Sequence, residues 1–161
     1  MFEKGKELVH LLENNKKTIS TMESCTGGGL ANYLTNVEGS SKVLQFSAVT
    51  YSNEFKVKMG VDKEIIDKYT VYSMETAHSM SKAISLYSNS DYGIGITGQL
   101  NCVDVMNPVD DKNKVFISIY DKDKNIFYED VVEVHEFVRS KNKETVISTV
   151  VDLLLDLLKN N

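Results

Sequence analysis

The residues that could carry out covalent chemistry lie in two short segments of the chain, at 39–41 and 51–56. The first segment ends in Ser41, and a serine hydroxyl is a poor nucleophile until a nearby base accepts its proton. The second contains Tyr51 and Lys56, and a lysine becomes a base when burial or cationic neighbours favour its neutral amine. Their spacing would allow both side chains to face one pocket. By spacing alone, however, three ordinary surface residues are the commoner explanation.

A third segment with potential chemistry is the run Met-Glu-Ser-Cys-Thr-Gly-Gly at residues 22–28. Backbone amides at the start of a helix bind anions, and glycines allow a ligand to approach them closely. The run is neither a Walker A loop nor a GxGxxG fingerprint, so a plain strand-to-helix turn is the simpler interpretation. Glu23 in this turn could orient a partner group or interact with the positive end of the helix dipole.

The histidines and cysteines form no recognisable catalytic or metal-binding pattern. The sequence has three histidines, His10, His78 and His135, and contains neither an HExxH motif nor a Gly-x-Ser-x-Gly elbow. Cys25 and Cys102 are far apart, which favours two reduced thiols over a disulfide or a zinc site. We therefore expect no metal ion, and neither a histidine-based triad nor a metal-bound hydroxide.

The charge and hydropathy patterns limit the classes of partner. The net charge is −5 and no basic run covers a face, which disfavours binding to a nucleic-acid backbone. Arg139 is the one arginine beside 17 lysines (18 − 1), and it could bind an anion or be a solvated residue at a helix start. The charged amino terminus does not resemble a signal peptide, and no apolar run is long enough for a bilayer span. We therefore expect a soluble cytoplasmic protein without a membrane partner.

The apolar periodicity predicts helices that alternate with strands, followed by a late antiparallel hairpin. The expected helices cover residues 3–13, 30–36, 53–59, 62–68, 73–87 and 144–158. The expected strands cover residues 17–22, 44–52, 92–97, 115–120 and 126–134, and residues 98–112 form a long loop. This order predicts one domain over residues 1–161 of the α/β class, a three-layer α/β/α sandwich with a mixed, mostly parallel sheet.

Four strings of the sequence resemble the carboxy-terminal domain of the CinA family, also labelled the competence-damage protein family. In chain order they are TISTMESCTGGGLANYLTNVEGSS, AVTYSNEFKVKMGV, YTVYSMETA and DYGIGITG. The succession ESCTGG, GSS and YSNE-x-K is a specific compound motif. The resemblance implies a nicotinamide-nucleotide amidohydrolase of NAD metabolism, which converts nicotinamide mononucleotide to nicotinic acid mononucleotide and ammonia without a metal or organic cofactor.

The resemblance also implies roles for individual residues. It assigns Ser41, chosen over Ser40, as nucleophile, Lys56 as general base and Tyr51 as a hydrogen-bonding assistant. Backbone amides of the glycine turns would stabilise the oxyanion. The expected substrate-binding residues are Glu23, Ser24, Thr26, Gly27, Thr97, Gly98 and Arg139.

The chain departs from the family pattern at residues 99–110, where a glycine- and proline-rich loop is replaced by a segment with Asp104 and Asp110. Arg139 and Lys143 could compensate for this negative charge. Two alternatives to the deamidase stay open: a non-catalytic homologue that binds a nucleotide or a partner protein, and an amidohydrolase with another amide substrate. The apolar helix near the carboxyl terminus fits either the core or a subunit contact, which leaves a homo-oligomer open.

Overall fold

The computed structural model describes residues 2–101 and 113–160, and within them five strands form one mixed sheet. The strand order across the sheet is β2-β1-β3-β4-β5. The strands are β1 (Ile19–Glu23), β2 (Leu44–Val49), β3 (Tyr92–Gly98), β4 (Lys114–Asp121) and β5 (Ile126–Glu133). Residues 102–112, which contain Cys102, Pro108 and most of the predicted long loop, lie outside the described residues.

The strand directions confirm a mixed, mostly parallel sheet. β1 pairs in parallel with both β2 and β3, whereas β4 is antiparallel to β3 and β5 is antiparallel to β4. Of these five strands, four therefore point the same way and β4 is reversed. Because β2, β1 and β3 are parallel neighbours, their carboxyl ends meet at one edge of the sheet, where α/β proteins commonly bind ligands.

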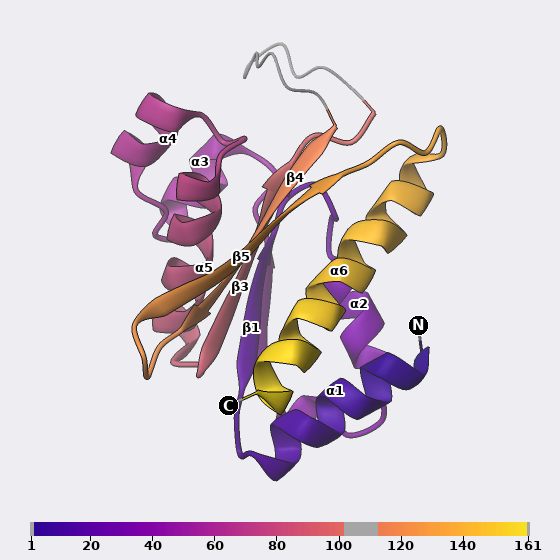
Figure 1. The fold of residues 1–161 in the computed structure, drawn as a ribbon. Coiled ribbons are helices and arrows are strands. Elements are labelled where there is room, and N and C mark those ends of the chain that lie inside the picture. The colour runs from indigo at the N-terminus through magenta and orange to yellow at the C-terminus, as the bar shows by residue number, and fades with distance from the viewer. Residues whose placement is uncertain (1, 102–112, 161) are drawn as a thin grey trace.

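Helices cover both faces of the sheet, as predicted for a three-layer α/β/α sandwich (Figure 1). One face carries α1 (Phe2–Asn14), α2 (Gly29–Thr35) and α6 (Arg139–Lys159). The other face carries α3 (Asn53–Lys58), α4 (Lys63–Tyr69) and α5 (Met74–Ser88). Among the described helices, none is long and apolar enough to cross a lipid bilayer.

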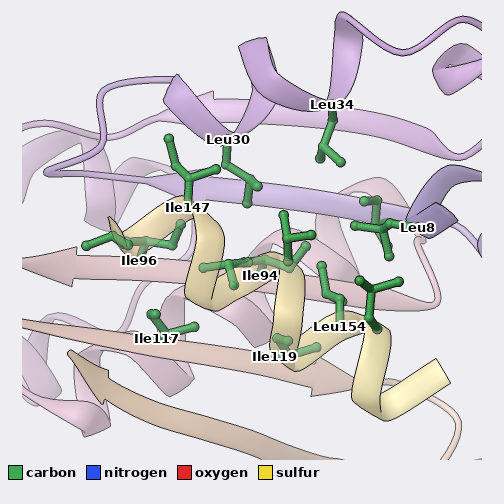
Figure 2. Close-up of a cluster of buried hydrophobic side chains, with 14 of the residues drawn as sticks. Leu8, Leu30, Leu34, Ile94, Ile96, Ile117, Ile119, Ile147 and Leu154 are labelled. Carbon is green, nitrogen blue, oxygen red and sulfur yellow. The ribbon is translucent and has the colours of Figure 1, made fainter. Parts of the chain in front are cut away.

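The larger hydrophobic core lies between the sheet and the layer of α1, α2 and α6 (Figure 2). Leu30 of α2, Leu154 of α6 and the strand residues Ile94 and Ile117 all belong to it and have no exposed surface. Burial of each such side chain contributes about 1.5–3 kcal/mol. A smaller core on the opposite face includes Met22 of β1 and Met80 of α5.

Most element boundaries lie within three residues of the sequence-based prediction, and two differences are larger in kind. The last helix, α6, begins at Arg139 instead of residue 144, because its polar first turn carries no apolar period by which it could be recognised. A short 3-10 helix, η1 (Ser40–Lys42), occupies the predicted loop before β2.

The sheet approaches α5 very closely at two glycines of β3. A Cβ atom on Gly93 would lie 1.9 Å from the Ser81 carbonyl oxygen, and one on Gly95 would lie 2.4 Å from that of Ala77. These distances leave no space for any side chain. The glycines therefore fix the depth at which α5 packs on the sheet.

We expect Gly93→Ala to lower the free energy of unfolding by at least about 1–3 kcal/mol, the usual cost of overpacking, in urea denaturation. Gly29→Ala is the matched control, because the one close contact of its Cβ would be with the movable end of the Ile147 side chain, at 2.8 Å, and not with backbone. Equal losses of stability in the two variants would contradict a close contact between β3 and α5.

Candidate active site

Three hydroxyl side chains form a row at the carboxyl ends of the parallel strands. Ser24 follows the central strand β1, Thr50 follows β2, and Thr97 lies near the end of β3. The Ser24 amide donates to the Ile96 carbonyl (3.0 Å) and the Thr50 amide donates to the Glu23 carbonyl (2.9 Å), so the three backbones remain adjacent. Neighbouring strands lie about 4.8 Å apart, which sets the spacing of the row.

The row faces the layer of α3, α4 and α5. Met22 of β1 and Ala48 of β2 pack in the smaller core with residues of α5, and side chains alternate along a strand. Two residues further on, Ser24 and Thr50 therefore share this face. Thr97 shares it as well, because its hydroxyl donates to the carbonyl of Val71, a residue of the same core (2.5 Å).

Lys56 joins this row from α3, the helix that follows β2. The Ser52 side chain accepts a hydrogen bond from the Phe55 amide (3.3 Å) and so begins the helix one turn before Lys56. The lysine side chain is 1% exposed, and its Nζ donates to Ser24 Oγ (3.1 Å) and to the Thr50 carbonyl (2.7 Å). The structure thus forms a serine–lysine pair, in which the serine is Ser24.

The structure does not bring Ser41 to Lys56, so the predicted pairing of these two residues is wrong. Ser41 lies in η1, before Leu44, and Leu44 pairs with Ile19 at the amino end of β1. The amine of Lys56 contacts Ser24 and Thr50, which lie just beyond the opposite, carboxyl ends of the same strands. Five residue steps along β2 separate the two ends by roughly 17 Å, too far for proton transfer between side chains. Ser40 lies at the same distant end of the sheet.

Tyr51 and Arg139 meet at the same edge of the sheet as Ser24. Tyr51 follows Thr50, is 65% exposed, and its hydroxyl accepts a hydrogen bond from Arg139 Nη2 (3.4 Å). The other terminal nitrogen, Arg139 Nη1, donates to the Leu100 carbonyl. The arginine therefore links the segment after β2 to the segment after β3, in a position next to the serine–lysine pair.

Glu23 is buried completely and holds the turn that follows β1. Its carboxylate accepts hydrogen bonds from the Thr26 hydroxyl (2.6 Å) and from the amides of Leu30 (3.0 Å) and Ala31 (2.9 Å). These contacts place negative charge at the amino end of α2, where it is favourable. Of the two roles considered from the sequence, this geometry matches the interaction with the helix end, and Thr26 takes part in it.

Thr97 and Gly98 also have contacts that organise the backbone. The Thr97 hydroxyl donates its hydrogen bond to the Val71 carbonyl. A Cβ on Gly98 would lie 2.4 Å from the Lys114 carbonyl oxygen, so glycine is required by the close approach of β4. A role for these two residues in substrate binding stays a prediction.

Positive charge gathers around the glycine turn. Burial raises the pKa of the Cys25 thiol to about 12, while the nearby charges of Arg139, Lys56 and Lys143 act in the opposite direction. Lys143 Nζ lies 3.3 Å from the position that a Cβ on Gly27 would take. The turn with Gly27 thus lies next to a cation, an arrangement suited to an anionic ligand.

The thiol of Cys25 is expected to be unreactive in the folded protein. Because its raised pKa keeps it protonated well above pH 8, the thiolate that attacks disulfide reagents is absent there. Titration with such a reagent at pH 8 should give the same number of rapidly reacting thiols for the native wild type and for Cys25→Ala. After denaturation, the wild type should gain one thiol relative to the variant. A native thiol that reacts rapidly and is lost in Cys25→Ala would contradict this environment.

Sequence reasoning placed Ser24 in the pocket but did not identify it as the partner of Lys56, and it missed Thr50. A partial signal was available: Ser24 lies just beyond the predicted strand 17–22 and Thr50 lies near the end of the predicted strand 44–52, and the carboxyl ends of parallel strands converge. Within residues 2–101 and 113–160, no group of three or more His, Cys, Asp or Glu side chains is placed to hold a metal ion.

Comparisons with known proteins agree on one family. The family model of the CinA C-terminal domain matches residues 3–160. A CinA-like protein of Endomicrobium trichonymphae is 36% identical over 155 residues, covering 92% of this chain and 33% of that protein. A CinA-like protein of Kosmotoga olearia is 47% identical over 92 residues, covering 56% of this chain and 22% of that protein. The chain thus spans about a third or less of the length of these relatives.

Solved structures agree with the observed fold. Competence/damage inducible protein CihA from Agrobacterium tumefaciens has a TM-score of 0.87 at 24% identity, covering 97% of this chain and 94% of that chain. A CinA superfamily protein from Klebsiella pneumoniae has a TM-score of 0.90 at 19% identity, covering 99% and 98%. The three-layer arrangement around the serine–lysine pair is therefore a fold already seen in solved proteins.

Proposed function

This chain belongs to the family of CinA C-terminal domains, and we propose that it is an amidohydrolase with Ser24 as nucleophile and Lys56 as general base. The observation that carries the proposal is the 3.1 Å contact between the buried Lys56 amine and the Ser24 hydroxyl. Burial disfavours the charged form of a lysine, and a neutral amine can accept the serine proton. Ser24 itself is partly exposed, so a substrate can reach its hydroxyl.

The reaction follows from this pair in two stages. Lys56 takes the Ser24 proton while Oγ attacks the amide carbonyl, and the resulting ammonium then donates the proton to the departing nitrogen as ammonia leaves. Water, with Lys56 again as base, hydrolyses the ester on Ser24 to release the acid. The backbone amides of the turn that begins at Ser24 are the kind of donor that stabilises the tetrahedral oxyanion.

We propose the carboxamide of a pyridine mononucleotide, nicotinamide mononucleotide, as the substrate. Arg139 and Lys143, four residues apart on α6, place two cations near the turn with Gly27, where a phosphate could bind. The exposed ring of Tyr51 offers a flat surface beside the pair, and the electron-rich face of such a ring attracts a cationic pyridinium. The products would be nicotinic acid mononucleotide and ammonia.

The proposal is tested by incubating the purified chain with nicotinamide mononucleotide and measuring ammonia. Ser24→Ala should lower kcat by about a thousandfold or more. The nucleophile and its base act as a unit, so the base alone cannot sustain the reaction once the nucleophile is removed. Ser41→Ala is the matched control and should keep near-wild-type activity, since Ser41 lies at the other end of the sheet. The assignment is overturned if Ser41→Ala is inactive and Ser24→Ala is active. The reaction itself is rejected if the wild type releases no ammonia.

Lys56 gives a second, independent test. Lys56→Arg should be nearly inactive although it keeps the positive charge, because a guanidinium does not give up its proton. The wild-type kcat/KM should rise with pH as the Lys56 ammonium loses its proton. Lys58→Arg, on the exposed surface of the same helix, should change neither the rate nor the profile. An active Lys56→Arg variant would show that this lysine positions substrate instead of accepting a proton.

A further inference from the structure

The carboxamide of Gln99 is buried and has no hydrogen-bond partner within residues 2–101 and 113–160. The residue is 4% exposed, and among the residues that the structure describes neither Oε1 nor Nε2 has a hydrogen-bond partner. The hydroxyl of Thr50, 1% exposed, is in the same situation within the described chain. Buried polar side chains are paired in most native proteins, because an unpaired one loses its hydrogen bonds to water without replacement.

A buried amide elsewhere in the molecule shows the ordinary structural case. Asn142 is 1% exposed and uses both ends of its carboxamide. Its Nδ2 donates to Asn101 Oδ1 (2.7 Å) and to the Glu136 carbonyl (2.9 Å), and its Oδ1 accepts from the Glu136 amide (3.0 Å). The Gln99 side chain makes no hydrogen bond of this kind to any residue that the structure describes.

Gln99 and Thr50 lie on either side of the serine–lysine pair. The Gln99 amide donates to the Lys114 carbonyl (3.0 Å), which continues the β3–β4 ladder one residue beyond β3. Side chains alternate along this extended segment, so Gln99 shares the face of Thr97, and that face is also the face of Ser24. Since β1 lies between β2 and β3, Thr50 is on one side of Ser24 and Gln99 is on the other.

We infer that Gln99, assisted by Thr50, binds the primary carboxamide of the substrate and discriminates it from the carboxylate of the product. This inference rests on the proposed amide hydrolysis. A carboxamide has an N–H donor and a carbonyl acceptor, and so does glutamine, so Oε1 can accept from the substrate amide while Nε2 donates to its carbonyl oxygen. A carboxylate has no donor. It leaves Gln99 Oε1 unpaired and places two acceptors together, which favours release of the acid.

The test measures binding by calorimetry in the Ser24→Ala background, so that the amide is not consumed. The probes are nicotinamide mononucleotide and nicotinic acid mononucleotide. We expect the parent to prefer the amide by about tenfold or more, as sites that hydrogen-bond a polar group reject analogues that lack it. Gln99→Met, which keeps length and volume, should weaken amide binding about tenfold and leave acid binding unchanged or slightly stronger, because the contact that disfavours the carboxylate is removed.

Two control readouts separate recognition from structure. Gln45→Met replaces the other glutamine of the chain, which is exposed on β2, and should change neither affinity. The ligand-free Tm of Gln99→Met should equal or exceed that of the parent, because an unpaired buried amide is removed. If Gln99→Met does not fold, Thr50→Val, of the same shape without the hydroxyl, should weaken amide binding alone.

These measurements distinguish failure of the Gln99 inference from failure of the proposed amide hydrolysis. The Gln99 inference is overturned if a folded Gln99→Met variant keeps the amide preference, if both probes lose affinity equally, if the Tm of that folded variant lies more than about 4 °C below that of the parent, or if the parent binds neither probe. Wild-type protein that releases no ammonia but shows a Gln99-dependent amide preference would reject the hydrolysis and retain the recognition. Ammonia release by the wild type, together with an amide preference that Gln99→Met leaves intact, would retain the hydrolysis and reject the role of Gln99.

Discussion

The buried amine of Lys56 is the interaction on which the rest of the site depends. An ammonium removed from water carries a desolvation cost of several kcal/mol, so the groups around it decide whether the site can exist. Here the Thr50 carbonyl and the Ser24 hydroxyl lie at 2.7 Å and 3.1 Å from Nζ. The Thr50 carbonyl holds the amine in place, and the Ser24 hydroxyl is the group that the amine could activate. In the proposed mechanism the serine thereby acquires a base, in a chain whose histidines lie in no catalytic pattern.

The surrounding polar residues keep this pair in register without being nucleophile or base themselves. Glu23 ties the end of β1 to the first turn of α2, so that Ser24 is held where the strand stops. Thr97 anchors β3 to the segment before α5, and Gly98 lets β4 approach β3. The carboxyl ends of three parallel strands are thus fixed by internal hydrogen bonds. This rigidity suits a site in which two side chains must stay within hydrogen-bonding distance.

The layer architecture and most elements follow from local periodicity, because alternating helices and strands leave few ways to bury their apolar faces. The identity of the nucleophile does not follow, since it depends on the register of β2 against β1. The pairing of Ile19 with Leu44 puts Ser41 at one end of the sheet and Ser24 at the other, a long-range relation that spacing in the sequence does not encode. The structure buries Lys56, the base expected from the family resemblance, and places its amine against Ser24 and not against Ser41. That the buried Gln99 carboxamide has no partner among the described residues is likewise visible only once the structure is known.

The central claim is that an acyl group forms transiently on Ser24. The most direct measurement starts the reaction with nicotinamide mononucleotide as substrate and stops it with acid. Mass spectrometry with peptide fragmentation then identifies the serine that carries the added acyl group. Fragmentation is essential because residues 18–42 contain both Ser24 and Ser41 between successive lysines at 17 and 42. The account predicts an adduct on Ser24 that is absent from Ser24→Ala and undiminished in Ser41→Ala. An adduct on Ser41, or ammonia release at full rate from Ser24→Ala, would contradict it.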